Sequence, residues 1–280
     1  MKKIIYFGYP FSFTHIAAMR RFGKGCEYIS QPTIAEVFAQ LKEVPNVTAV
    51  VPIENTGGGM VYDTVDELLR DDFLGSGLKI REQLSFSIVL NLLARTKLDL
   101  DKVKKIYSHK FAHTACRRWV KKHLPSAEVV DVVSTSEAAK RAYQQMNSCA
   151  IGSKEAAKYY GLKILKHNIA KGDVKHDITK FFVIETGKRI LQEKDVRTSL
   201  AFSLAHKVGT LARALGVLAR NQINLTRIIS RPSDKGAWEY KFLIEFKGST
   251  HSEKVRKALK RLKKYTLTLN DLGSYPTREV

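Results

Sequence analysis

An apolar run that leads directly into a polar, glycine-rich loop constrains the fold of this chain more than any other feature. The run, Val47 to Ile53, is rich in β-branched residues and has turn-forming residues on both sides, which predicts a short buried strand. Glu54, Asn55 and Thr56 follow it, and three glycines occupy positions 57–59. Because glycines allow backbone N–H groups to approach a ligand closely, the end of this strand is a candidate binding site.

The segment after the glycines predicts a helix that opens at Thr64 and carries acidic residues in its first turn. A strand, a polar glycine loop and a helix start, in this order, form the place where open α/β sheets bind small anions. The same pattern also fits a tight turn in which the amide and hydroxyl side chains only cap the helix. The residues alone leave both interpretations open.

The length and composition of the chain predict a two-domain globular protein. Its 280 residues allow a sizeable core, and 44% apolar with 27% charged residues is an ordinary balance for a soluble fold. No apolar run approaches the roughly 20 residues that cross a bilayer, and the basic, then apolar start at 1–7 is too short for a signal peptide. Cys26, Cys116 and Cys149 follow no paired spacing, which predicts reduced thiols, a cytoplasmic location and no zinc site.

The net charge of +21 has two possible explanations. A strongly basic chain can bind nucleic acid or another polyanion. Here the basic residues are spread along the chain, with only local clusters at 102–105, 121–122 and 254–264, and aromatic residues that would stack on bases are not interleaved with them. We therefore favour solvated basic faces. Nucleic-acid binding, whose affinity would fall steeply with salt, is the less favoured alternative.

Strand and helix patterns alternate over the first two thirds of the chain, which predicts parallel sheets with helical crossovers. Strands are expected at 3–8, 47–53, 106–108, 128–133, 149–152 and 180–184, an extended segment at 80–93, and helices at 12–22, 33–42, 112–123, 136–146 and 154–160. We expect the chain to pass between two lobes near 75–81 and to return within 165–178. Residues 1–187 would thus form one two-lobed domain.

The last third predicts a separate small domain at 198–280. The charged stretch 188–197 lacks an apolar period, and we assign it as a linker. The elements that follow are expected as a strand at 198–204, a helix at 209–220, strands at 225–230 and 238–246, a helix at 252–264 and a strand at 265–270. This βαββαβ order is the ferredoxin-like unit.

Several short motifs give the chain a family resemblance. They are Val51–Thr56 with Gly59, Val61, Thr64 and Asp66 behind it, Ser134–Ala139, Ala150–Ser153 through to Leu162, Thr179–Phe181, Gly209–Leu211, Ser230–Pro232 and Leu272–Pro276. In these motifs, and over nearly its whole length, the chain resembles a prephenate dehydratase with a C-terminal ACT regulatory domain.

The resemblance implies an α/β fold with a two-lobed, periplasmic-binding-protein-like dehydratase domain followed by a ferredoxin-like ACT domain. It implies the conversion of prephenate to phenylpyruvate, water and carbon dioxide in phenylalanine biosynthesis, without a metal or organic cofactor. Aromatisation drives this reaction, so the protein has mainly to supply position and electrostatics. The implied partners are prephenate, L-phenylalanine as an effector, and further copies of the chain in a homodimer or a dimer of dimers.

Thr179 is the catalytic candidate, because it stands where the family carries its catalytic threonine. Its hydroxyl would donate a hydrogen bond to the departing ring hydroxyl, since its own pKa is far too high for a strong acid. The substrate-binding candidates are Ser12, Thr14, Glu54, Asn55, Thr56, Ser108, Lys180 and Phe181. Lys180 and N–H groups near Ser12 and Thr56 would take carboxylate oxygens, and Phe181 would form an apolar wall.

Three of these candidates have an alternative role. Glu54 and Asn55 can instead orient the glycine loop through hydrogen bonds to the backbone, and Ser108 can instead act as a cap. The effector-binding candidates are Gly209, Thr210, Leu211, Ser230, Arg231 and Pro232, of which Arg231 can instead form a surface ion pair.

Several positions depart from the usual pattern of the family. They include Phe11 in place of a glycine, Phe111, Asp177 in place of an asparagine, Lys180 in place of an arginine, Val208 in place of a proline and Ile229 in place of a glutamate. A phenylalanine is unfavourable wherever a positive φ is needed, and a lysine lacks the bidentate fork of an arginine. Two alternatives therefore accompany the leading hypothesis: an arogenate dehydratase, and a phenylalanine sensor without catalysis.

Overall fold

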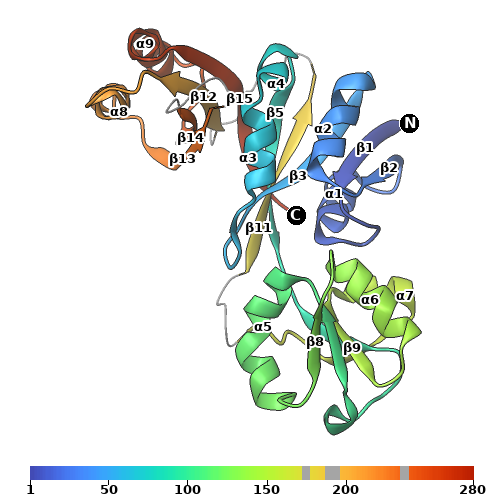
Figure 1. Ribbon diagram of the computed structural model, residues 1–280. Coiled ribbons are helices and arrows are strands. Elements are labelled where there is room, and N and C mark those ends of the chain that lie inside the picture. The colour runs from blue at the N-terminus through green and yellow to red at the C-terminus, as the bar shows by residue number, and fades with distance from the viewer. Residues whose placement is uncertain (172–176, 187–195, 234–239) are drawn as a thin grey trace.

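The computed structural model describes residues 1–171, 177–186, 196–233 and 240–280, and these residues form two sheets (Figure 1). The larger sheet has ten strands in the order β13-β14-β12-β15-β5-β11-β3-β1-β2, with β4 paired to β3. The smaller has five strands in the order β10-β6-β9-β7-β8. The chain is thus an α/β protein with two lobes and a C-terminal domain, as expected.

The first lobe is built from both ends of the dehydratase-like segment. Its elements are β1 (Lys2–Phe7), α1 (Phe13–Phe22), β2 (Cys26–Gln31), α2 (Ile34–Glu43), β3 (Val47–Asn55), β4 (Gly59–Met60), α3 (Tyr62–Leu69), α4 (Asp71–Gly75), β5 (Lys79–Ser87) and β11 (Ile178–Glu185). Strand β1 is parallel to β2 and β3, whereas β11 runs antiparallel between β3 and β5. Helix α1 packs on one face of this sheet, and α2 and α3 pack on the other.

The second lobe alternates strands and helices around the smaller sheet. Its elements are β6 (Asn91–Ala94), a 3₁₀ turn (Leu100–Lys102), β7 (Lys105–Ser108), α5 (Lys110–His123), β8 (Glu128–Asp131), α6 (Thr135–Gln144), β9 (Ser148–Gly152), α7 (Lys154–Tyr160) and β10 (Lys163–Lys166). Strand β7 lies parallel to both β8 and β9. The carboxyl ends of these strands therefore share one edge, as the alternating pattern predicts.

The chain passes from the first lobe to the second at residues 88–90, between β5 and β6, and not near 75–81. Gly75 ends α4, Gly77 lies in the turn between α4 and β5, and β5 still pairs with β11 over its whole length. The return falls between β10 and β11, within the expected range. The two crossing segments hydrogen-bond to the opposite crossing: the Ile88 N–H donates to the Asp177 carbonyl (2.7 Å) and the Ile169 N–H to the Leu90 carbonyl (2.8 Å).

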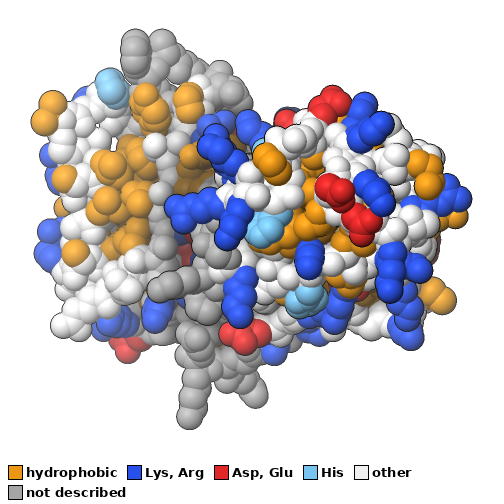
Figure 2. Space-filling model, turned by 90° about the horizontal axis from the view of Figure 1, so that it is seen from below, with side chains coloured by type: hydrophobic (Ala, Val, Ile, Leu, Met, Phe, Trp, Pro, Cys, Tyr) orange, Lys and Arg blue, Asp and Glu red, His pale blue; other side chains and the backbone are white. Residues whose placement is uncertain are grey.

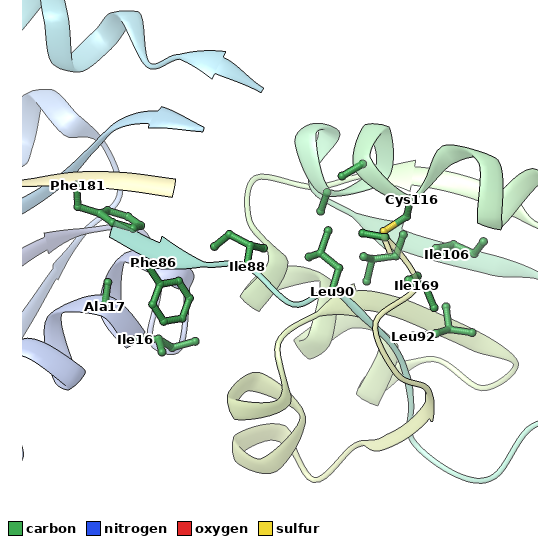
Figure 3. Close-up of a cluster of buried hydrophobic side chains, with 14 of the residues drawn as sticks. Ile16, Ala17, Phe86, Ile88, Leu90, Leu92, Ile106, Cys116, Ile169 and Phe181 are labelled. Carbon is green, nitrogen blue, oxygen red and sulfur yellow. The ribbon is translucent and has the colours of Figure 1, made fainter. Parts of the chain in front are cut away.

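One hydrophobic core continues through this crossing (Figure 3). Phe86 and Phe181 lie in the first lobe, Ile88 and Leu90 lie on the crossing segment, and Ile106 lies in the second lobe. Because apolar side chains are buried on the connection itself, the hinge between the lobes is packed.

The C-terminal domain has the predicted βαββαβ order. Its elements are β12 (Val196–Leu204), α8 (Thr210–Arg220), β13 (Leu225–Pro232), β14 (Tyr240–Lys247), α9 (Glu253–Leu262), a 3₁₀ turn (Lys263–Tyr265) and β15 (Thr268–Glu279). All of its strand pairs are antiparallel, and α8 and α9 cover one face. On the other face Ala201, Ile229 and Leu243 join the core of the first lobe.

Strand β15 belongs to both domains. Residues Thr268 to Pro276 pair with β12, and the end of the strand, Thr277 to Glu279, pairs in parallel with Gln83 to Ser85 of β5. Gly273 lies at the point where the strand passes β5: its φ is +133°, and a Cβ built there would lie 2.3 Å from the Ile80 carbonyl oxygen. Only glycine fits this contact.

Candidate functional site

The ends of β3 and β11 meet at Asn55, whose side-chain amide is fully engaged. Its Nδ2 donates to Asp177 Oδ1 (2.6 Å) and to Thr179 Oγ1 (2.9 Å), while its Oδ1 accepts from the N–H groups of Gly57 (2.9 Å) and Gly58 (2.6 Å). The two glycine N–H groups therefore point at Asn55 and not at a ligand. Of the two interpretations left open, the one in which Asn55 orients the glycine loop agrees with this geometry.

The Thr179 hydroxyl is left with a hydrogen to donate. It is half-buried, and it accepts the hydrogen bond from Asn55. A threonine hydroxyl has one donor and two acceptor positions. The bond from Asn55 uses one acceptor position, so it does not use the hydrogen of the Thr179 hydroxyl. Beside it, burial raises the pKa of Asp177, although the hydrogen bond from Asn55 opposes the shift.

Thr56 closes the junction between β3 and β11 and has no backbone donor left for a substrate. Its N–H donates to the Ile178 carbonyl (3.0 Å), and its Oγ1 accepts from the Ile178 N–H (2.9 Å). The strand ladder therefore occupies the N–H of Thr56 itself, and the use of N–H groups near Thr56 for a carboxylate stays a prediction.

Glu54 and Lys180 lie on the face of the sheet opposite to Thr179, because successive side chains of a strand alternate. Lys180 Nζ is 3.0 Å from Glu54 Oε2, and Arg227 Nη2 of the C-terminal domain is 2.8 Å from the same oxygen. Burial acts to raise the pKa of Glu54, but the two cationic donors hold it below its ordinary value. These side chains are thus brought to the domain junction and not to Thr179.

Phe181 is a core residue. It is 1% exposed and packs with α1 and Phe86 on the face that also carries Thr179. It lies two positions further along β11 than Thr179, where α1 covers the sheet, and its role as an apolar wall stays a prediction.

The loop between β1 and α1 positions the two hydroxyl candidates of the first lobe. Ser12 is the N-cap of α1, accepting from the His15 N–H (3.4 Å), and Thr14 is buried in the first turn. Phe11 adopts a φ of +62°. The conformation that the sequence marks as unfavourable for a phenylalanine is therefore present, and it is held by the hydrogen bond from the Phe11 N–H to His15 Nδ1 (2.9 Å).

The second lobe reaches the first lobe through its helices: through the starts of α5 and α6 and the end of α7. The Ser136 hydroxyl of α6 donates to the Pro10 carbonyl, and Tyr159 of α7 stacks on Phe11 with ring centroids 4.3 Å apart. Phe111 of α5 covers the glycine loop, since a Cβ on Gly58 would lie 3.0 Å from its ring. The loops at the carboxyl ends of β1 and β3 therefore face the second lobe, which is the edge where α/β sheets bind ligands.

Ser108 and His109 end β7 in that second lobe. Ser108 is fully buried and donates to the His109 carbonyl (3.1 Å). Burial lowers the pKa of His109, with Asp131 acting in the opposite direction. At neutral pH this imidazole is therefore mostly uncharged.

The effector candidates fall into two groups within one chain. Gly209 caps α8 with a φ of +78°, and the Thr210 hydroxyl donates to the carbonyls of Ala205 (3.0 Å) and Lys207 (2.9 Å). Of this group, Thr210 and Leu211 border a cavity of about 140 Å³, whose described lining is Leu204, Ala205, His206, Lys207, Thr210, Leu211, Tyr240 and Phe242.

The second effector group, Ser230 to Pro232, lies on β13 and lines no part of this cavity among the described residues. Arg231 instead forms a bidentate ion pair with Asp66 of α3 (2.5 and 2.6 Å). Within a single chain the fold does not bring the two effector motifs together.

Comparisons with known proteins agree with the two parts of this fold. Residues 4–189 match the prephenate dehydratase family model, and residues 198–264 match the ACT domain model. A bifunctional chorismate mutase/prephenate dehydratase of Aquifex aeolicus is 40% identical over 98% of this chain and 73% of its own length. A prephenate dehydratase of Methanocaldococcus jannaschii is 38% identical over 87% of this chain and 86% of its own length.

A solved structure matches the whole arrangement. The prephenate dehydratase from Arthrobacter aurescens in complex with L-Phe superposes with a TM-score of 0.89 at 28% identity, covering 98% of this chain and 90% of its own. No helix among the described residues is long and apolar enough to cross a membrane. Since the first family model covers well over half of the sequence, the chain belongs to the prephenate dehydratase family.

Proposed function

We propose that this prephenate dehydratase of phenylalanine biosynthesis carries out its reaction where Asn55 meets Thr179, between the two lobes. The observation that carries the proposal is the hydrogen bond from Asn55 Nδ2 to Thr179 Oγ1 (2.9 Å). Because this bond occupies an acceptor position of the hydroxyl, the Thr179 hydrogen is free to be donated to the leaving hydroxyl of prephenate.

The chemistry requires little more than this donor and a site shielded from water. Loss of the ring hydroxyl and of carbon dioxide produces an aromatic ring, so the driving force is in the substrate. A neutral donor placed on the departing oxygen stabilises the negative charge that develops there. The contacts of Phe11 and Phe111 across the lobes limit the access of water, which strengthens such a hydrogen bond.

Substrate carboxylates are best assigned to the other hydroxyl candidates. Ser12 and Thr14 lie at the start of α1, and Ser108 lies at the end of β7 in the facing lobe. Glu54 and Lys180 would support the site indirectly, from the opposite face of the sheet.

Replacement of Thr179 by Val tests this assignment, because valine keeps the shape and removes only the hydroxyl. We expect kcat for phenylpyruvate formation to fall by roughly 10²–10⁴-fold, with an unchanged circular dichroism spectrum, and Thr179→Ser to retain activity. Wild-type turnover in Thr179→Val would refute the role of the hydroxyl. Assays with prephenate and with arogenate in parallel decide between the two related substrates.

We also propose that L-phenylalanine regulates the enzyme from the ACT domain. A relative with the same fold binds L-Phe, and the cavity beside α8 offers Leu204 and Phe242 to an aromatic ring. Addition of L-Phe should lower turnover of the wild type, and Tyr240→Ala at the cavity rim should weaken that inhibition. Equal turnover with and without L-Phe, together with no binding heat in calorimetry, would disprove the regulation.

A homodimer, or a dimer of dimers, is the assembly that we propose. Among the described residues, strand β13 is the edge of the ten-stranded sheet and pairs on one side only. Hydrophobic side chains gather on the ACT side of the molecule, at the left of Figure 2. Val208 and Ile228 are among the exposed apolar residues of the ACT domain. Light scattering should give at least twice the chain mass of 31.6 kDa, and a monomer at micromolar concentration would exclude the proposal.

The remaining assignments concern boundaries, location and charge. We propose residues 1–187 as the dehydratase part, 188–197 as a linker and 198–280 as the ACT domain; most of this linker lies outside the described residues. The free cysteines favour a reducing, cytoplasmic location. Lys and Arg side chains are dispersed in separate groups over the face seen in Figure 2, which favours solvated basic faces over a nucleic-acid site.

A further inference from the structure

We propose that Arg227, a side chain of the ACT domain, is a positioning residue for the dehydration site. It would hold the carboxylate of Glu54 and so fix the end of β3. The residue after Glu54 is Asn55, which donates a hydrogen bond to Thr179. The inference rests on the proposed site around Thr179 and adds a residue that none of the sequence motifs contains.

Arg227 is buried and bridges the two domains. It is 9% exposed, its Nη2 lies 2.8 Å from Glu54 Oε2 in the first lobe, and its Nη1 lies 2.9 Å from Glu245 Oε2 in the ACT sheet. Its guanidinium also lies 5.6 Å from the ring centroid of Phe182 on β11. A planar guanidinium holds two carboxylates at a fixed separation, which a lysine ammonium does less well.

The ACT end of this bridge is firmly anchored. Glu245 is 1% exposed and has three further partners: Arg197 Nη1 (2.7 Å), Thr226 Oγ1 (2.6 Å) and the Tyr275 hydroxyl (3.0 Å). A buried carboxylate with this many donors stays in place. Glu54, whose side chain is 32% exposed, is therefore the partner that moves if the bridge changes.

The first-lobe end of the bridge acts on both residues of the site. Glu54 is the backbone neighbour of Asn55, and Lys180, the backbone neighbour of Thr179, shares the same Glu54 oxygen with Arg227. The register between β3 and β11 shifts just here, because Lys180 pairs with Glu54 whereas Phe181 pairs with Pro52. Such a bulge re-aims the side chains beyond it, so its geometry needs the fixation that Arg227 supplies.

Other ion pairs between described residues also join the domains and differ in where they attach. Arg231 pairs with Asp66 of α3, Lys241 with Asp71 of α4 (3.0 Å), and Arg278 with Glu82 of β5 (3.6 Å). The Lys241 contact lies beyond the glycine loop, because Lys241 also donates to the Leu69 carbonyl at the end of α3, and neither of these partners is Glu54. It provides a matched control, because its loss weakens the same domain junction without releasing the end of β3.

Strand β13 also connects this bridge to the proposed regulation by L-Phe. Arg227 and the effector candidates Ser230 to Pro232 lie on the same strand. A ligand that binds better to one position of β13 shifts the population toward that position, and Arg227 would carry the shift to Glu54.

The experiment compares Glu54→Gln, Arg227→Gln, the double variant and the control Lys241→Met. For each we would measure kcat, KM for prephenate, the inhibition by L-Phe and the thermal midpoint. Each of the two single variants should lower kcat about tenfold with KM changed less than about threefold, which is within the range of coupled neighbouring sites. The double variant should be no slower than the slower single variant, because both changes cut one link. Lys241→Met should stay within about twofold of wild-type kcat.

Glu54→Gln decides the question even if Arg227→Gln fails to fold. It leaves the buried pair of Arg227 with Glu245 intact and replaces a partly exposed carboxylate by an amide of the same shape. Wild-type kcat in Glu54→Gln, or a lower thermal midpoint without a lower kcat, would show that the bridge is only structural. The result is separable from the fate of the proposed site, since that site fails if Thr179→Val stays active.

Discussion

At the scale of single residues, His15 determines how the loop before α1 responds to acid. The imidazole stacks on Tyr6 with ring centroids 4.4 Å apart, contacts the rings of Phe11 and Tyr28 edge-on, and accepts a hydrogen bond from the Phe11 N–H. Burial lowers the pKa of His15 to about 4 from an ordinary 6.5. A proton on Nδ1 would turn the acceptor into a donor that faces another donor.

The sign of the pH dependence follows from this shift. Because the folded pKa lies below the unfolded one, the stabilisation is complete above pH 6.5 and is lost as the pH falls through about 4. The loss amounts to about 3 kcal/mol at most. Thermal midpoints between pH 7.5 and 4 should fall less in His15→Phe than in the wild type. The exposed His251 serves as the control, and an equal acid slope in His15→Phe and His251→Gln would contradict the assignment.

For single residues, the sequence predicted a role best where a short contiguous motif carries the chemistry. The motif at 179–181 identifies Thr179, which the structure joins to Asn55. The same motif does not place Lys180 and Phe181, because its spacing does not say which face of β11 each side chain occupies. Arg227 gave no signal, since a lone arginine on a strand becomes a bridge only through contacts distant in the chain.

At the scale of elements, the glycine loop and α5 restrict each other's position. A Cβ on Gly58 would lie 3.0 Å from the Phe111 ring and 3.3 Å from Asn55 Oδ1. The element that carries Asn55 and the helix of the facing lobe are therefore in tight contact, and a small change in one displaces the other.

We expect Gly58→Ala to lower kcat about tenfold, because the added methyl group displaces either Phe111 or Asn55. Combined with Phe111→Leu, which frees space in front of the loop, the alanine variant should recover most of the lost activity. Steady-state kinetics of the two single variants and the double variant measure this. A double variant as slow as Gly58→Ala alone would rule out the contact with Phe111 as the cause.

Most elements could be predicted from the sequence, and two of the strands that were missed share a physical property. The strands β2 and β10 lie at the edges of their sheets and contain only half-buried and exposed residues. Without a fully buried face they lack the apolar run or the alternation that marks a strand. The helix starts at Ser12 and Thr33 were located well because both residues are observed N-caps.

At the scale of the whole molecule, β15 makes the two domains one sheet. The lobe crossing at 88–90 and the pairing of Thr277 to Glu279 with β5 were both beyond prediction from the sequence. Each depends on which strands become neighbours, and a local pattern carries no information about neighbours from distant segments.

Gly273→Ala should destabilise both domains together. Its Cβ would overlap the Ile80 backbone, which cannot rotate away, and its φ of +133° is strained for any other residue. We expect a loss of about 3 kcal/mol or more and a single unfolding transition in calorimetry. Gly25→Ala, where a Cβ meets no atom within 4 Å, should change stability by less than about 1 kcal/mol. Similar midpoints for the two variants would refute the crowding argument.

Because β15 is shared, the time between the synthesis of β5 and the synthesis of the end of β15 matters for the growing chain on the ribosome. Strand β5 leaves the ribosome early, but the residues that cover its edge are made about 190 residues later. At a synthesis rate of about 5–20 residues per second, that edge stays open for about 10–40 s. Throughout this interval the nascent first lobe carries an unpaired strand edge that can bind another chain. The end of the ACT domain therefore covers this edge of the first lobe last, and it protects that lobe from aggregation during synthesis.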